Sequence, residues 1–233
     1  YEGVEIEGIG ATGLITYMRT DSLRISDEAA EQAKIYITDT YGKEYLPATR
    51  RVFKTKKNAQ DAHEAIRPSD PSLTPDRVKK DLTAEQYKLY KLIWERFIAS
   101  QMANALLDTV AVDIEAANCL FKASGFTVKF DGFTVLYEES KDTDDEDTAS
   151  LPPLEAGNVL TLKELTANQH FTQPPARYTE ASLIKTLEEN GIGRPSTYAP
   201  TITTILARGY VERENKSLKP TALGEVTTKL MEE

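Results

Sequence analysis

The sequence predicts an α+β fold built from several domains. Helical spacing of apolar residues in the first half, alternation with a period of two between residues 108 and 137, and a return to helical spacing after residue 179 support this class. With 233 residues, 40% of them hydrophobic, the chain can form two or three compact units. We expect a helical domain over 1–103, a β-rich arch over 104–175 and a helix-turn-helix-like unit over 176–233.

The first domain is expected to contain a strand and two main helices. Residues 14–18 are rich in β-forming side chains and predict a strand that ends in a polar turn. Ser26 offers an N-cap for a helix that Gly42 ends. Thr83 opens a stronger helix with a capping-box pattern. The second helix carries a stripe that should be buried in the core: Tyr87, Tyr90, Ile93, Trp94, Phe97 and Ile98.

The middle of the chain predicts an antiparallel β unit, with turns at Gly125 and at Asp131-Gly132. Its alternating apolar residues are Val110, Val112, Ile114, Phe126, Val128 and Phe130. Residues 138–147 carry seven acidic residues and one lysine, which is typical of a solvated loop. A second strand-like run, 159–165, precedes Pro174 and Pro175, a plausible linker.

The last part of the chain predicts two helices followed by a hairpin. The first helix should run from Thr179 to Asn190, and the second should be capped by Ser196 and end near Gly209. Residues 210–219 then indicate a hairpin. This order is typical of a winged helix-turn-helix, and an ordinary helical hairpin packed on a sheet fits the local pattern equally well.

Charge permits nucleic-acid binding without demonstrating it. The net charge is −9, but the 138–147 run alone contributes −6. Residues 43–67 carry +4 and residues 177–219 carry +2. Since screening limits exposed charges to about 8 Å at physiological salt, these local values matter more than the total.

Several classes of protein are excluded or disfavoured by composition. The single cysteine, Cys119, excludes a disulfide framework and a Cys-rich zinc module, and a reducing, cytoplasmic setting fits best. No apolar run has the length of a membrane span, and no signal peptide is visible. No G-x-x-x-x-G-K pattern for ATP phosphates occurs.

Two short motifs fail on their context. Residues 8–13 fit the dinucleotide pattern G-x-G-x-x-G, but that site needs a helix immediately afterwards, and residues 14–18 are strand-like. Asp142, Asp144 and Glu146 have a spacing suited to Mg²⁺, but they lie in a run of charge without the rigid apolar strand that such ligands need.

Tyr17 and Arg19 have a spacing that suits phosphoryl transfer. Alternate residues of a strand share a face, so the phenol would lie beside the guanidinium. Arginine can hold a phosphate within reach of the phenolic oxygen. A phenol, with a pKa of about 10, is also a better leaving group than a sugar hydroxyl, so the bond could be reversed without ATP. Spacing alone does not select Tyr17 among 11 tyrosines, because a half-buried tyrosine beside a surface arginine is common.

Three long segments resemble the bacterial type IA DNA topoisomerases, in the same order and over nearly the whole chain. The first, GLITYMRTDS, resembles the active-site segment of that family. The second is AHEAIRP, and the third runs discontinuously from residue 171 to 211 and includes GIGRPSTY. The matched segments correspond to Gly13–Ser22, Ala62–Pro68, and the region containing Gly191–Tyr198.

The resemblance implies roles for individual residues. Tyr17 would be the nucleophile that joins the 5′ phosphate of a cut single strand, and Arg19 would steady the attacked phosphate. His63 would contact DNA phosphate or belong to a proton network, although a buried capping histidine is the alternative. Arg194, Ser196 and Thr197 match positions associated with single-strand binding, as expected at a helix N-terminus. Asp21 and Arg67 would have supporting roles only.

The resemblance also implies what lies elsewhere in the protein. The metal-binding Toprim domain of the family has no counterpart in these residues, and neither do its zinc-bearing repeats. We therefore expect Mg²⁺ to be needed by the full-length enzyme with ligands outside this chain, and the piece alone to be inactive in relaxation. The rival hypotheses are a non-enzymatic winged-helix DNA binder and a structural arch with a vestigial tyrosine motif.

Overall fold

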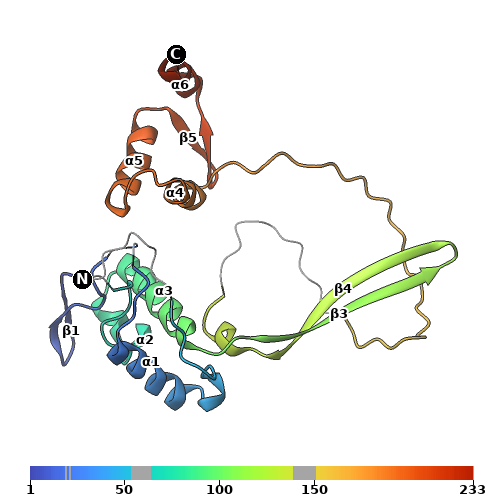
Figure 1. Cartoon of the computed structure of the whole chain (residues 1–233), viewed down its shortest axis with the longest axis horizontal. Helices are drawn as coiled ribbons and strands as arrows, with labels where there is room; N and C mark the ends of the chain where they lie inside the picture. Colours follow the sequence, from blue (N-terminus) through green and yellow to red (C-terminus); the bar gives the residue numbers. More distant parts are fainter. Residues whose placement is uncertain (19, 21, 54–63, 139–150, 233) are drawn as a thin grey trace. The chain divides into compact units, whose positions relative to one another are not determined.

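The computed structural model describes residues 1–18, 20, 22–53, 64–138 and 151–232. They form two compact units, Tyr1–Leu160 and Thr161–Glu233. Figure 1 shows helices and small antiparallel sheets in both, which confirms the predicted α+β class. Arg19, Asp21 and His63, and the acidic triplet Asp142, Asp144 and Glu146, lie outside the described residues. The three-part division at residues 103 and 175 stays a prediction.

Two helices organise the first unit, as predicted. Helix α1 (Asp27–Thr40) is capped by Ser26, whose hydroxyl accepts from the Ala29 N–H. Helix α3 (Ala84–Gln101) begins with a reciprocal capping box between Thr83 and Gln86. Between them lie the short helix α2 (Pro75–Val78) and the 3₁₀ turns η1 (Lys43–Tyr45) and η2 (Lys79–Asp81).

The core of this unit lies where α3 packs on α1 and on the loop before α2. The predicted stripe is confirmed: Tyr90, Trp94, Phe97 and Ile98 are buried, and Tyr87 and Ile93 are partly buried. The indole N–H of Trp94 donates to the Pro71 carbonyl (3.0 Å), and the Tyr90 hydroxyl donates to the Leu73 carbonyl (2.6 Å). Burial raises the pKa of Tyr90, and nearby Asp70 raises it further.

The N-terminal segment differs from its prediction. A hairpin of β1 (Val4–Ile6) and β2 (Gly10–Thr12) occupies the glycine-rich start, and no helix follows directly, so the dinucleotide motif is correctly rejected. Residues 14–18 do not form a strand; only Ile15 makes an isolated bridge, to Pro68. Pro68 has no N–H to extend a ladder, which is a physical reason for the pairing to stop there.

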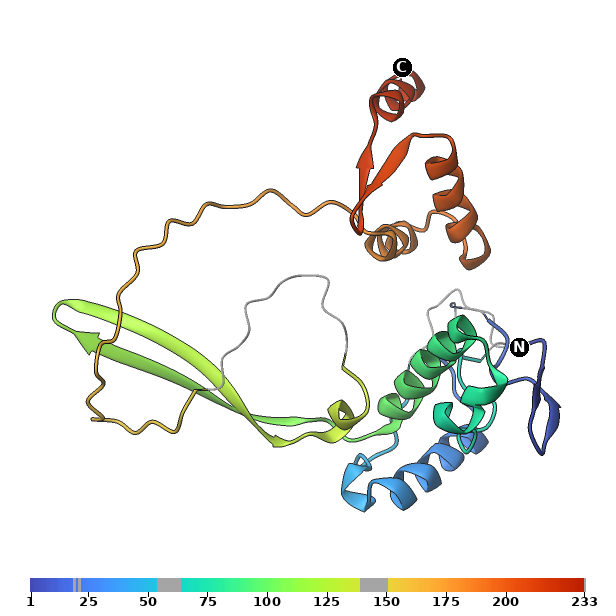
Figure 2. The same ribbon diagram turned by 180° about the vertical axis from the view of Figure 1, so that it is seen from behind.

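A long two-stranded ribbon follows α3. Strands β3 (Leu106–Ala116) and β4 (Cys119–Phe130) pair antiparallel, as predicted. Figures 1 and 2 show the ribbon extending away from α1 and α3. The turn prediction at Gly125 was wrong, since Gly125 lies inside β4 opposite Val110. The chain turns at Ala117 and Asn118, where Ala117 adopts a φ of 53°.

The predicted strand over 159–165 was also wrong. The structure assigns no strand there, and Val159 is almost fully exposed. A strand needs a neighbouring backbone to satisfy its N–H and C=O groups, so apolar spacing alone does not make one.

The ribbon joins the helices through a short clamp. Tyr45 donates its hydroxyl hydrogen to Asp131 (2.8 Å), and this bond raises the pKa of the phenol. The Ala103 N–H donates to the Tyr45 carbonyl (2.7 Å), and the Phe133 N–H donates to the Ala103 carbonyl (3.0 Å). Phe133 lies in η3 (Gly132–Val135), so both strands of the ribbon are tied at their base.

The second unit contains the elements predicted for it and one more. It has helices α4 (Glu180–Glu189) and α5 (Pro195–Ala207) and the hairpin of β5 (Val211–Glu214) and β6 (Ser217–Pro220). Helix α6 (Ala222–Glu232) was not predicted. The N-cap of α5 is Arg194 rather than Ser196, because Pro195 suits the first helical position, where its missing N–H costs nothing.

Close packing at the base of the ribbon predicts that replacing Gly132 by alanine lowers the free energy of unfolding. This glycine has a φ of +50°, and an added Cβ would lie 2.5 Å from the Asn104 backbone. We expect Gly132→Ala to destabilise the first unit by about 1–3 kcal/mol more than Gly8→Ala. Gly8 is the matched control, since its φ is +78° and nothing lies within 4 Å of its added Cβ. Denaturant unfolding of the chain measures the difference, and equal losses would contradict the predicted clash.

Candidate functional site

Tyr17 lies on the surface of the first unit, directly after a segment that is firmly held. Its side chain is 54% exposed, and its ring contacts the ring of Tyr1 edge-on, with centroids 5.2 Å apart. Leu14, three residues earlier, is buried in the core. The phenol is therefore available to a large substrate while the backbone that carries it is anchored.

The anchor is a short antiparallel pairing between residues 13–16 and 65–69. The Thr16 N–H donates to the Arg67 carbonyl (3.0 Å), and the Ser69 N–H donates to the Leu14 carbonyl (2.9 Å). The Ser69 hydroxyl also bonds to the Gly13 carbonyl. The structure thus brings together the described parts of the two sequence segments GLITYMRTDS and AHEAIRP, which lie about fifty residues apart in the chain.

Arg67 binds groups of its own segment, residues 64–68. Its guanidinium binds the Glu64 carboxylate through Nε (3.0 Å) and Nη2 (2.7 Å), and its Nη1 donates to the Pro68 carbonyl (2.9 Å). The Arg67 and Glu64 side chains are 12% and 22% exposed. Partial burial makes this ion pair costly to break from one side. The supporting role expected for Arg67 stays a prediction.

The other two predicted catalytic residues cannot be placed. Arg19 and His63 lie outside the described residues, so the expectation of a guanidinium beside the Tyr17 phenol stays a prediction. The described residues on either side of Arg19 are Met18 and Thr20, and Glu64 directly follows His63.

The predicted DNA-binding residues lie together at the start of α5 in the second unit. Arg194, Ser196 and Thr197 are all exposed. The Thr197 hydroxyl accepts from the Arg194 N–H (2.9 Å), which closes the first turn, and the Arg194 side chain donates to the Gly193 carbonyl (2.7 Å). Gly193 has a φ of +77°, a conformation that favours glycine. A helix N-terminus with an exposed arginine is suited to an anion such as phosphate.

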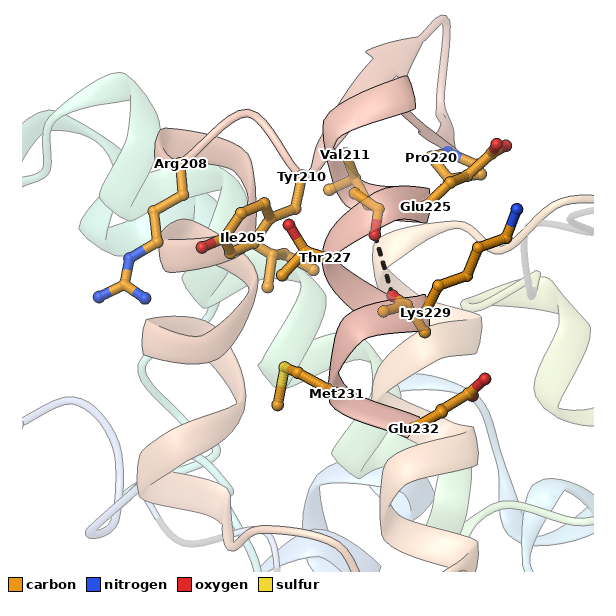
Figure 3. A pocket seen from close by; sticks show the side chains of 12 residues that line it. Ile205, Arg208, Tyr210, Val211, Pro220, Glu225, Thr227, Lys229, Met231 and Glu232 are labelled. Carbon is orange, nitrogen blue, oxygen red and sulfur yellow. Dashed lines mark hydrogen bonds between the residues drawn. The ribbon is translucent and has the colours of Figure 1, made fainter.

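A hollow in the second unit lies away from these residues. It has a volume of about 750 Å³ and lies between α5, the hairpin and α6, with Ile205, Arg208, Tyr210 and Met231 in its lining (Figure 3). Arg208 caps the C-terminal end of α5, whereas Arg194 precedes its N-terminal end. Arg194, Ser196 and Thr197, the described site residues of this unit, do not line the hollow.

Two further features are absent from the described part of the chain. In those residues no group of three or more His, Cys, Asp or Glu side chains is placed to hold a metal ion. No helix among them is both long and apolar enough to cross a membrane.

Residue-level sequence reasoning missed Thr16 as part of the site. Its hydroxyl bonds to backbone groups of residues 65 and 67, and no side-chain pattern signals such partners. The sequence offered only an indirect indication. Two segments that both resemble parts of one family are expected to meet in space, and Thr16 lies in the first of them.

Comparison with known proteins identifies the family. The sequence profile of the bacterial DNA topoisomerase family matches residues 1–233. The full-length topoisomerase I of Thermotoga maritima has a similar structure, with a TM-score of 0.77 and 36% sequence identity. That match covers 100% of this chain and 37% of the Thermotoga protein, so the chain spans little more than a third of its relative. The chain therefore belongs to the bacterial DNA topoisomerase family.

Proposed function

We propose that this chain is the tyrosine-bearing part of a type IA topoisomerase, which cuts and reseals one DNA strand through Tyr17 and relaxes negative supercoils. The observation that carries the proposal is the exposed Tyr17 phenol on a backbone anchored by the second family segment. The family membership of the whole chain supports it. A winged-helix DNA binder without enzymatic activity has no support beyond the order of elements in the second unit.

The proposed chemistry is a reversible exchange of two oxygen–phosphorus bonds. The Tyr17 oxygen attacks a backbone phosphate and loses its proton, while the 3′ oxygen of the upstream nucleotide leaves as a hydroxyl. The cut strand is then held by a 5′-phosphotyrosine link. Attack of the 3′ hydroxyl on the same phosphorus restores the strand and the phenol, so no ATP is required. Strand passage occurs between the two steps.

Charged groups would assist the two steps. In the proposal Arg19 binds the attacked phosphate and stabilises its developing charge, and His63 contacts DNA phosphate or relays a proton. Mg²⁺, when bound by a Toprim region elsewhere in the protein, would supply further charge neutralisation. Among the described residues no cluster of His, Cys, Asp or Glu is placed to hold it. We also propose that this piece alone does not relax DNA. The full-length enzyme would act in the cytoplasm, in association with the nucleoid.

The second unit is proposed to bind single-stranded DNA. Arg194 would contact a phosphate at the start of α5, and Ser196 and Thr197 would offer hydroxyl groups from the first turn. Since Pro195 has no N–H, side chains carry more of this contact than at an ordinary helix start.

Replacing Tyr17 tests the proposal directly. In the full-length protein with Mg²⁺ and negatively supercoiled plasmid, Tyr17→Phe should abolish relaxation, because no oxygen remains to attack phosphorus. Tyr1→Phe is a matched control, since Tyr1 is 56% exposed and its ring contacts the ring of Tyr17. It should keep nearly full activity.

Mass spectrometry of the trapped adduct adds a second readout. The wild-type protein and Tyr1→Phe should each carry the nucleotide on Tyr17. Relaxation by Tyr17→Phe at the normal rate, or an adduct on another side chain, would rule the assignment out.

Replacing Arg194 tests the proposed single-strand contact. Arg194→Ala should weaken binding of a single-stranded oligonucleotide about tenfold, as expected for loss of a charged hydrogen bond. It should also reduce the slope of log K against log salt by about 0.7. Arg208→Ala, at the opposite end of α5, is the control and should change neither value. Fluorescence anisotropy over a salt series measures both, and equal effects of the two variants would contradict the contact.

A further inference from the structure

Thr16 stands out because its short side chain bridges to a segment far away in sequence. Its hydroxyl donates to the Ala65 carbonyl (2.8 Å) and accepts from the Arg67 N–H (3.0 Å). Its own N–H donates to the Arg67 carbonyl (3.0 Å). The hydroxyl therefore uses its single hydrogen and a lone pair on two backbone groups about fifty residues away.

The same segment holds the chain on the other side of Tyr17. The Ala65 N–H donates to the Arg24 carbonyl (2.8 Å). Ala65 thus accepts a bond from Thr16 and donates one to Arg24, so that one residue ties together the two ends of the segment that contains Tyr17. The Glu64–Arg67 ion pair flanks this tie and stabilises the residues that make it.

We propose that Thr16 is a positioning residue for the proposed reaction: its hydroxyl fixes the backbone next to Tyr17, and through it the approach of the phenolic oxygen to phosphorus. This inference rests on the proposed function of Tyr17. In the proposed reaction Thr16 does not touch the reacting atoms. It acts through the peptide that joins it to Tyr17, together with the bond between Ala65 and Arg24.

The reason for this coupling is geometric. The direction of the Tyr17 Cα–Cβ bond is set by the backbone that carries it, and Thr16 fixes that backbone one residue earlier. In-line attack tolerates little displacement, and a misplacement of about 1 Å can cost a factor of about 100 in rate. The two hydroxyl bonds of Thr16 add to its main-chain bond to Arg67. Together they restrict rotation of the Thr16 backbone, which a single main-chain bond would allow.

Three substitutions separate positioning from folding. Thr16→Val keeps the branched shape and removes both hydroxyl bonds, and Thr16→Ser keeps the hydroxyl and removes a methyl group. Thr12→Val is the control, because the Thr12 hydroxyl bonds locally to the Gly10 carbonyl (3.0 Å), two residues away in the same unit. Each change is made in the full-length protein, with Tyr17→Phe measured in parallel.

The measurement is the single-turnover rate of covalent cleavage of a single-stranded oligonucleotide, at a temperature well below each variant's unfolding midpoint. Oligonucleotide affinity is measured alongside. Thr16→Val should lower the cleavage rate at least about tenfold at unchanged affinity. Thr16→Ser should restore most of the rate, and Thr12→Val should cleave like the wild type. If Thr16→Val does not fold, Thr16→Cys replaces it, since a thiol is a weaker donor and acceptor.

The outcomes distinguish this inference from the proposed function. Cleavage by Thr16→Val at the wild-type rate, with Tyr17→Phe inactive, would overturn positioning by Thr16 and leave the nucleophile in place. Equal loss in Thr16→Val and Thr16→Ser, or in Thr12→Val, would also overturn it, because the bridging hydroxyl would not be the cause. Cleavage by Tyr17→Phe would overturn the proposed function itself.

Discussion

The antiparallel pairing of residues 13–16 with residues 65–69 is the contact on which the candidate site depends. It joins a segment that begins in the core at Leu14 to one held by the Glu64–Arg67 ion pair. Backbone hydrogen bonds are individually worth only about 1 kcal/mol, but several in register define a direction as well as an energy. The pairing therefore fixes the backbone that leads directly into the exposed Tyr17.

The proposed nucleophile and the proposed single-strand contact lie in different units. The first provides an exposed phenol on an anchored backbone, and the second provides an arginine at a helix start. Neither the −9 net charge nor the hollow between α5, the hairpin and α6 points to these residues. DNA contacts a protein along an extended path rather than inside one cavity. Local charge and exposed hydrogen-bonding groups are therefore better guides to a DNA-binding surface than total charge or the presence of a hollow.

Much of the fold was predictable wherever local signals and long-range packing agreed. The caps at Ser26 and Thr83 located α1 and α3, and apolar spacing identified the buried face of α3. The strands predicted over 14–18 and 159–165 failed because β structure depends on a partner that the sequence does not name. Gly125 was misread as a turn, since glycine is also accepted inside a ribbon. Thr16 was overlooked because its partners are main-chain atoms.

The clamp at the base of the ribbon has a mechanical consequence. Both strands enter and leave the helical part beside Tyr45, where the main chain of Ala103 and the side chain of Asp131 are bonded to the same residue. A force applied at the Ala117–Asn118 tip is therefore delivered to one hydrogen-bonded attachment rather than to two independent strands. Because Tyr45 bonds to both ends of the ribbon, leverage along the ribbon acts on the helical part through this single residue.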